Sequence, residues 1–276
     1  SFALAIRGQV QTDNIATLEP SVGVYLDEMY IARAYGLNTN LLDVRSAQIL
    51  KGPQGTLFGR NTSAGAVLFQ TNDPEFDKIS ALAEGRYGRF EERAGTGIVN
   101  LGFNDRIALR GAVYYERRND YQRDVRTGRG YGDRETLNGR VKAAFKPADT
   151  VTLLVSGEWF HGKSDGPARQ NLYYSIQGTG FDPGAPDRAL FGGDPDKVAV
   201  TQASQTAGIP ASLIQTDIKT ETYMAKLAVD IGFGEVKWIN GYRHIEGYSP
   251  VDLDGSSQTI GNHISIAIQD LKQWST

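Results

Sequence analysis

The sequence of 276 residues contains no cysteine and only three histidines. Without cysteine, the chain forms neither a disulfide framework nor a thiolate metal site. The histidines, His161, His244 and His263, show none of the close spacings that metal ligands adopt, so we expect no metal ion. The formal net charge of -3 lacks the basic excess of a nucleic-acid-binding protein, so we expect no nucleic-acid partner.

Long hydrophobic runs are also absent. No segment approaches the roughly 18 consecutive apolar residues of a membrane-spanning helix. The first residues, Ser1–Ala5, contain neither an initiator methionine nor a signal peptide, and the last, Gln273–Thr276, contain no terminating turn. We therefore expect the sequence to be a fragment of a longer protein whose targeting signals lie elsewhere.

One segment has the spacing of a nucleotide-binding motif. Gly157–Ser164 matches the Walker A pattern, but its four intervening residues are Glu-Trp-Phe-His, three of which carry bulky rings. A phosphate-binding loop needs small residues followed by a helix, whereas this segment continues a strand-like alternation. The order and spacing of serine, histidine and aspartate also suggest no catalytic set. We therefore expect neither an enzyme nor a cofactor.

Glycine and tyrosine are abundant, with 32 and 13 residues, and the chain has two regions of different pattern. The first 74 residues mix short β-like runs with turns. Phe2–Val10, Val22–Ile31 and Ala66–Thr71 are predicted strands, and Leu41–Leu50 is predicted to be a short helix that leads into a strand. These features are typical of a compact mixed α+β domain.

After Pro74 the pattern changes to alternation of two sets of residues, which places one set on each face of a strand. Several of the predicted strands reach about ten residues, the tilted length that crosses a membrane, whereas soluble strands usually have about five or six. Roughly eight strand candidates follow Pro74. The clearest are Arg106–Tyr115, Leu137–Lys146, Val151–Trp159 and Tyr223–Ile231.

The connections between these strands alternate between short and long, as in a transmembrane β-barrel with short periplasmic turns and long outer loops. The short ones are Gly102–Asp105, Lys146–Thr150 and Ile231–Glu235, and the long ones are Arg118–Arg134, Gly162–Lys219 and Gly247–Asn262. One face of the strands is rich in charge, which suits a wet lumen better than the core of a soluble sandwich. Its charged residues are Arg106, Arg110, Glu116, Arg140, Lys142, Lys146, Lys226 and Asp230.

Four segments of the first region resemble, in order, the plug domain of TonB-dependent outer-membrane receptors. They are Ile6–Gln9, Val22–Arg33, Leu42–Gly59, which contains the hallmark-like run ILKGPQGTLFG, and Ala64–Pro74. The resemblance implies a mixed α+β plug in residues 1–74. It also implies that residues 75–276 are the first antiparallel strands of a transmembrane β-barrel, which in this family has about 22 strands.

The resemblance gives the plug motif a structural and gating role, with several departures from the family pattern. Gln48 and Lys51 stand where the family has a glutamate and an arginine that lock the plug to the barrel wall by ion pairs. Gln48 carries no charge and Lys51 makes no bidentate contact, so we expect a weaker lock, or one distributed over Arg45 and Asp43. Glu28 replaces a turn glycine, so its hairpin must be shaped differently. The motif residues are Arg45, Gln48, Lys51, Gly52, Pro53, Gly55, Gly59 and Gly65.

The function that the resemblance implies is energy-coupled uptake of a scarce ligand, such as an iron-siderophore, across the outer membrane of a Gram-negative cell. The implied partners are TonB, the extracellular ligand and outer-membrane lipid. Arg7, Arg33 and Tyr35 follow the predicted upper plug strands and are the candidates to face the ligand. Two alternatives remain open: a non-transporting relative that acts as a signalling receptor or adhesin, and a soluble β-sheet binding module.

Overall fold

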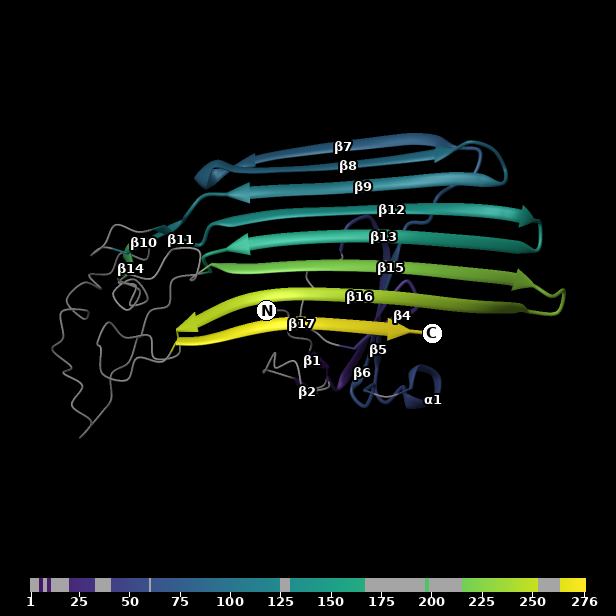
Figure 1. Cartoon of the computed structure of the whole chain (residues 1–276), viewed down its shortest axis with the longest axis horizontal. Helices are drawn as coiled ribbons and strands as arrows, with labels where there is room; N and C mark the ends of the chain where they lie inside the picture. The colour runs from purple at the N-terminus through teal and green to yellow at the C-terminus, as the bar shows by residue number, and fades with distance from the viewer. Residues whose placement is uncertain are drawn as a thin grey trace.

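The computed structural model describes residues 5–6, 9–10, 20–32, 41–59, 61–124, 130–166, 197–198, 215–252 and 264–276. Most of these residues form two β-sheets, one of four strands and one of eight, that lie against each other (Figure 1). Among them, no helix has the length and apolar character needed to cross a membrane. Two minor sheets are also present: β1 (Ala5–Ile6) with β2 (Gln9–Val10), and β10 (Gln122–Asp124) with β11 (Gly130–Tyr131) and β14 (Lys197–Val198).

The four-stranded sheet, called here the small sheet, lies within residues 22–71. Its spatial order is β4 (Met29–Ile31), β3 (Val22–Leu26), β6 (Gly65–Thr71) and β5 (Val44–Lys51). β3 and β6 run parallel, and the other neighbours run antiparallel. The strand predicted over 66–71 is therefore confirmed as β6.

The helix predicted within Leu41–Leu50 is wrong, because most of this segment belongs to β5. Its backbone pairs with β6 from Val44 to Lys51, and this pairing satisfies the hydrogen bonds that a helix would make internally. In the described residues, the helical content is one turn, α1 (Gly55–Phe58), and a 3-10 turn, η2 (Arg89–Glu91). The expected mixed α+β region is thus mainly β in its described part.

The eight-stranded sheet, called here the large sheet, pairs every strand with its neighbour in antiparallel fashion. The four clearest predicted strands are confirmed. The long connection predicted over Gly247–Asn262 is partly wrong, because β16 continues to Asp252 and pairs there with β17. In spatial order the strands are β7 (Ile79–Gly88), β8 (Glu92–Gly102), β9 (Ile107–Arg118), β12 (Arg134–Ala148), β13 (Val151–Ser164), β15 (Thr216–Asp230), β16 (Glu235–Asp252) and β17 (Ile264–Ser275).

The large sheet has an apolar outer face and a polar inner face. On β12, Leu137 and Val141 are 50% and 49% exposed on the outer face, whereas Arg140 and Lys142 between and beside them are only 4% and 1% exposed. This difference follows from the period of two along a strand, since successive side chains point to opposite faces. The alternation read in the sequence therefore separates the two faces as expected.

Aromatic rings on the outer face contact one another across neighbouring strands. The ring centroids of Trp159 and Tyr223 lie 5.9 Å apart on β13 and β15, and those of Tyr242 and Trp274 lie 4.6 Å apart on β16 and β17. Such contacts stabilise cross-strand pairs beyond the burial of their area. The rings form a row across four strands, because Tyr223 also stacks on Tyr242.

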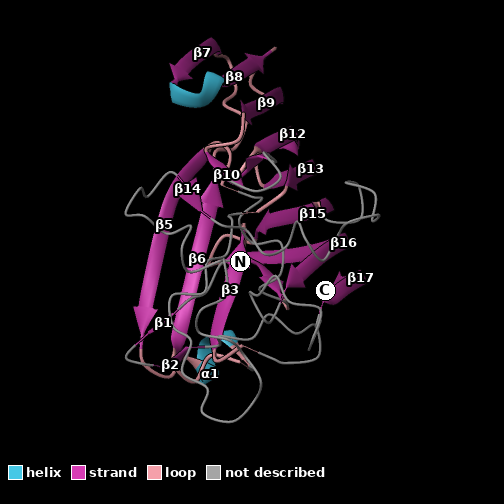
Figure 2. Cartoon of the chain, turned by 90° about the vertical axis from the view of Figure 1, so that its left-hand side faces the viewer, coloured by secondary structure: helices cyan, strands magenta, loops and turns pink. Residues whose placement is uncertain are grey.

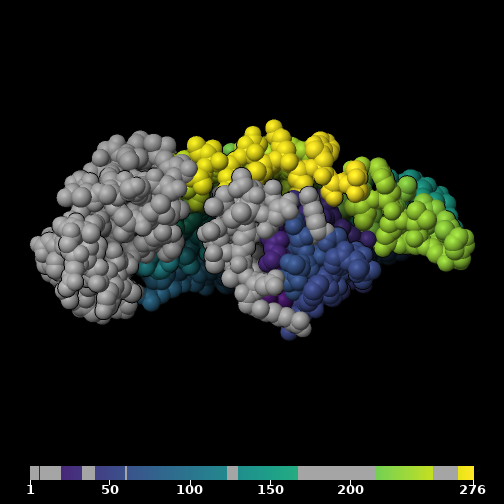
Figure 3. Space-filling model, turned by 90° about the horizontal axis from the view of Figure 1, so that it is seen from below, coloured from purple at the N-terminus to yellow at the C-terminus, as the bar shows by residue number. Residues whose placement is uncertain are grey.

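The small sheet lies against the inner face (Figure 3), and its strands cross those of the large sheet instead of running along them (Figure 2). The apolar part of this contact centres on Met29 of β4, which packs with Met224 of β15 and Ile239 of β16. Gly241 of β16 permits this approach, since a Cβ there would lie 2.0 Å from the Met29 sulfur. The other buried members of the cluster are Val24, Leu26 and Ile31.

The linker, residues 72–78, joins the two sheets and is fixed to the large one. Asn100 of β8 is completely buried beneath it. The Asn100 side-chain oxygen accepts a hydrogen bond from the backbone N–H of Glu75 at 2.8 Å, and its amide group donates to the carbonyl oxygens of Glu75 and Lys78 at 2.9 and 2.7 Å. One side chain therefore satisfies three backbone groups of the linker.

Replacing Gly241 with valine is expected to loosen the small sheet, because the new side chain would collide with Met29. Overpacking of this kind costs about 1–3 kcal/mol. The midpoint of urea unfolding of the small sheet, followed by protease susceptibility of the detergent-solubilised full-length protein, should fall. The same change at Gly139 on β12, where a Cβ meets nothing within 4 Å, is the matched control. Combining Gly241→Val with Met29→Ala should restore the midpoint, and failure to do so would refute the proposed contact.

Candidate functional site between the two sheets

Lys142 of β12 is the most buried charge of the interface between the sheets. Its ammonium nitrogen lies 3.0 Å from a carboxylate oxygen of Asp27, in the β3–β4 turn, and 2.9 Å from one of Asp73, in the linker. Asp27 also accepts hydrogen bonds from the backbone N–H and the hydroxyl of Thr71 at 2.7 and 2.6 Å. Lys142 thus joins the large sheet to the turn, to β6 and to the linker at one point.

Arg110 of β9 makes a second connection, with Asp43 at the start of β5. Its Nε and one terminal nitrogen donate to the two oxygens of this carboxylate at 2.6 and 2.8 Å. The two side chains are 13% and 4% exposed. This two-pronged contact is the geometry that guanidinium and carboxylate groups favour, and it fixes orientation as well as distance.

The pKa of the Asp43 carboxyl group reflects this contact. Burial alone would raise it, but the hydrogen bonds from Arg110 and Asn72 and the charges of Arg110 and Arg140 outweigh burial, so the pKa lies below its ordinary value. Asn72 of the linker donates to Asp43 at 2.8 Å. The carboxylate is therefore held in its charged form by groups from both sides of the interface.

Glu28 makes a third connection, with the lysines of β15 and β16. Its carboxylate binds the ammonium group of Lys226, and Lys237 lies 3.5 Å from the same oxygen. Asp27 and Glu28 form the two-residue turn between β3 and β4, and both have left-handed backbone angles, with φ of 49° and 76°. A two-residue hairpin with positive φ at both positions favours asparagine or aspartate followed by glycine, so Glu28 at the second position is unusual.

Two further polar contacts reach the backbone of the small-sheet region. The Gln273 side chain of β17 donates to the carbonyl oxygen of Tyr30 at 2.6 Å and accepts from the N–H of Ala32 at 3.0 Å. Arg140 donates to the carbonyl oxygen of Leu42 and also pairs with Glu158 of β13 at 2.5 Å. The interface is therefore polarised: its described carboxylates come mainly from the small sheet and linker, and its cations come from the large sheet.

The residues predicted to form a plug motif lie away from these contacts. Arg45, Gln48 and Lys51 are exposed on β5, and none of the described ion pairs involves Arg45 or Lys51. Of the two residues that were expected to share the lock, Asp43 makes a contact described above, whereas Arg45 makes no described ion pair. The glycines of the motif lie in and beside the loop that follows β5. Gly52 and Gly59 have φ of 94° and 74°. At Gly65, a Cβ would lie 2.3 Å from the carbonyl oxygen of Leu50.

Pro53 in this loop and Gly55, the first residue of α1, are both exposed. The candidates to face a ligand, Arg7, Arg33 and Tyr35, lie outside the described residues, as does most of the predicted loop Gly162–Lys219. Their roles stay predictions.

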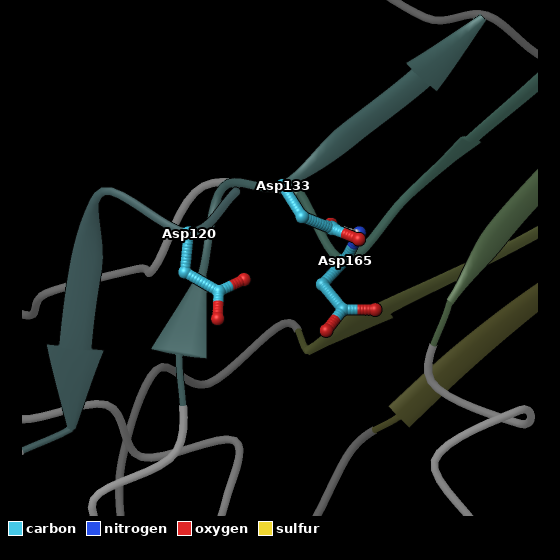
Figure 4. A group of neighbouring side chains, drawn as sticks. All are labelled: Asp120, Asp133 and Asp165. Carbon is cyan, nitrogen blue, oxygen red and sulfur yellow. Dashed lines mark hydrogen bonds between the residues drawn. The ribbon is translucent and has the colours of Figure 1, made fainter. Parts of the chain in front are cut away.

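Three carboxylates gather near the ends of β9, β12 and β13. Oxygen atoms of Asp120, Asp133 and Asp165 lie within 4.8 Å of one another (Figure 4). The Asp133 carboxylate accepts a hydrogen bond from the backbone N–H of Asp165 at 2.5 Å, which gives it a role in shaping the turn. Exposed acidic groups often gather without binding an ion, and the expected absence of a metal stays a prediction.

Sequence reasoning singled out four of the cations of this interface, but not Lys237 and not most of the partners. Arg110, Arg140, Lys142 and Lys226 belong to the charged face that the alternation predicted. Asp27 and Asp73 gave no signal, because turn and linker aspartates are common at exposed positions. Gln273 gave none either, since pairing across some 240 residues of sequence leaves no local pattern.

Asp43→Asn is expected to destabilise docking of the small sheet at neutral pH by about 3 kcal/mol, since it leaves Arg110 without its anionic partner. A carboxyl group with a lowered pKa stabilises above its ordinary pKa of 3.8 and loses this contribution as the pH falls through the lower folded value. The gap between the wild-type and variant urea midpoints should therefore be full above about pH 5 and shrink towards pH 3. A gap that is constant from pH 7 to about pH 3 would contradict the assignment.

No protein-family model matches the sequence. Several solved structures resemble the chain, among them three bacterial receptors. The open form of the ferric-catecholate import receptor Fiu from E. coli K12 aligns with 91% of this chain and 37% of its own, at 17% identity and a TM-score of 0.63. The ferric yersiniabactin uptake receptor FyuA from Yersinia pestis aligns with 88% of this chain and 35% of its own, at 17% identity and 0.59.

The siderophore receptor PiuA from Acinetobacter baumannii aligns with 91% of this chain and 34% of its own, at 12% identity and a TM-score of 0.59. The chain thus spans about a third of the length of the receptors that it matches. At such identities the likeness concerns the fold. Fiu and FyuA are described as import and uptake receptors and PiuA as a siderophore receptor, and none is an enzyme by name. The chain therefore shares its fold with TonB-dependent siderophore receptors, the family that its sequence resembles.

Proposed function

We propose that the chain is part of a TonB-dependent outer-membrane receptor for energy-coupled uptake of an iron chelate. In this proposal residues 1–74 form the plug and residues 75–276 form the first part of the barrel wall. The observation that carries it is the polarised docking of the small sheet on the inner face of the large one. A permanently closed core would need no such concentration of charge between its two parts.

The outer face of the large sheet supports a position in the outer membrane of a Gram-negative cell. Its strands are 10 to 18 residues long, and the outer face presents aliphatic and aromatic side chains to the surroundings. Soluble proteins seldom expose an apolar surface of this extent, whereas membrane lipid covers it at no cost. In this proposal the row of rings from Trp159 to Trp274 contacts lipid.

The interface suits a part that must leave and return. Buried ion pairs contribute little net stability, because their formation removes both partners from water. When the sheets separate, the freed carboxylates and ammonium groups are hydrated again, so the loss of contact is largely offset. TonB, by pulling on the receptor from the periplasm, would then displace the small sheet and open a path for the ligand.

Recognition of the ligand belongs to the outer end of the molecule in this proposal. Arg7, Arg33 and Tyr35 stay the candidates to contact it, together with the loop Gly162–Lys219. No covalent chemistry is required of the receptor. A second candidate function, signalling without transport, uses the same interface but no displacement of the small sheet from the wall.

A reversible cross-link tests the displacement. The Met29 Cγ lies 3.1 Å from the position that a Gly241 Cβ would take, which is close enough for a disulfide bond between cysteines at these positions. In the full-length receptor, oxidised Met29→Cys/Gly241→Cys should abolish growth on the iron chelates that support the wild type. Reduction with dithiothreitol should restore growth, because the rest of this chain contains no cysteine.

Each single cysteine variant is the control and should grow under both conditions. Deletion of TonB should abolish growth in the same way as the cross-link. Unimpaired uptake with the disulfide closed would contradict transport through displacement of the small sheet. Uptake that is insensitive to the loss of TonB would contradict the energy coupling and favour the signalling or adhesin alternative.

A further inference from the structure

The inner face of the large sheet carries an excess of positive charge where the small sheet docks. The region comprises the inward positions of β16 from Lys237 to Arg243 and the positions level with them on β9, β12, β13 and β15. It contains one carboxylate, Glu158. Its six cations, called here the cation stripe, are Arg110, Arg140, Lys142, Lys226, Lys237 and Arg243.

The charges that neutralise the cation stripe come largely from the other side of the interface. Asp27, Glu28 and Asp43 belong to the small sheet and its turns, and Asp73 belongs to the linker. Within the region of the stripe itself, Glu158 forms an ion pair with Arg140. Just below it, Glu235 approaches Lys237 at 3.2 Å. Displacement of the small sheet would therefore remove at least three anions and leave the cations behind on the wall.

Cations fixed on a low-dielectric wall create a positive potential that concentrates anions near them. The members of the stripe lie on four of five adjacent strands, from β9 to β16. Neighbouring members are one or two strand spacings apart, about 5–10 Å, which is comparable to the Debye length of about 8–10 Å at physiological salt. Their fields therefore overlap in the space that the small sheet vacates. An anion would be drawn along this wall, whereas a cation would be repelled from it.

On this basis we propose that the cation stripe lines the opened path and selects a cargo of net negative charge, such as a chelate bearing several carboxylate or phenolate oxygens. This inference rests on the proposed function, because it needs the small sheet to leave. It gives the lysines and arginines two successive roles. In the closed state they hold the small sheet, and in the open state they attract the cargo.

The two roles are separable at Lys226, because its ion pair with Glu28 has one partner on the large sheet and one on the small sheet. Lys226→Gln and Glu28→Gln break the same contact and should loosen the small sheet to a similar extent. Only Lys226→Gln removes charge from the wall of the opened path. If the lysine served docking alone, the two variants would behave alike in every assay of the open state.

The test uses the full-length protein in a planar lipid bilayer, with urea to displace the small sheet and a KCl gradient as the probe. The open wild-type channel should favour chloride over potassium. The variant Lys226→Gln/Lys237→Gln should lower the chloride-to-potassium permeability ratio roughly twofold, because it removes two neighbouring wall charges. Glu28→Gln should open at lower urea but keep the wild-type ratio. Lys226→Arg/Lys237→Arg, which preserves charge, should keep it too.

An unchanged ratio in Lys226→Gln/Lys237→Gln would overturn the inference, as would an equal fall in Glu28→Gln. A wild-type channel that favours potassium would overturn it as well. The proposed function fails in a different way: urea would then open no conductance in any variant, because no removable part would block a pore. Because urea-induced conductance requires a folded, inserted barrel, every variant that opens also reports that it has folded.

Discussion

Lys142 is almost completely buried and charged, so Asp27 and Asp73 must stay within contact distance for as long as the two sheets are docked. An ammonium group deprived of its anions in such a place costs several kcal/mol. Because Asp27 lies in a turn and Asp73 in the linker, this one lysine fixes the position of the small sheet and the path of the chain out of it. Arg110 and Lys226 repeat the arrangement on either side.

The acidic residues that form ion pairs with these cations have an uncommon backbone conformation. Asp27, Glu28 and Asp43 all have positive φ, at 49°, 76° and 53°. Left-handed backbone costs roughly 1–2 kcal/mol for most residues with a side chain, such as Glu28, and less for aspartate, whose short side chain can hydrogen-bond locally. Glycine would remove this cost but would also remove the carboxylate. The turn between β3 and β4 thus gives up local stability for the contact of Glu28 with Lys226 of the large sheet.

The sequence predicted most of the large sheet, because an alternation of period two reports strands and their faces without any long-range information. β9, β12, β13 and β15 lie where the pattern placed them, and Arg110, Arg140 and Lys142 share the inner face. The helix expected near β5 was wrong, since pairing with β6 overrides the local preference of that segment. The interface itself was out of reach: contacts such as that of Glu28 with Lys226 join residues 198 apart. Only the ion pair of Asp43 was anticipated in part, because Asp43 was one of the two residues expected to share the ion-pair lock.

The three hydrogen bonds of Asn100 have a mechanical consequence. They fasten the backbone at Glu75 and Lys78 to β8, on the side of the linker that leads into the large sheet. A force applied to the small sheet would therefore act on the ion pairs in succession. The hydrogen bonds of Asn100 would meanwhile hold the linker to the large sheet. The displaced small sheet would remain attached by a few linker residues close to its docking position. Its return would then be redocking within the reach of a short segment instead of a new folding event. The rate of redocking would depend on the flexibility of the backbone between Asp73 and Glu75.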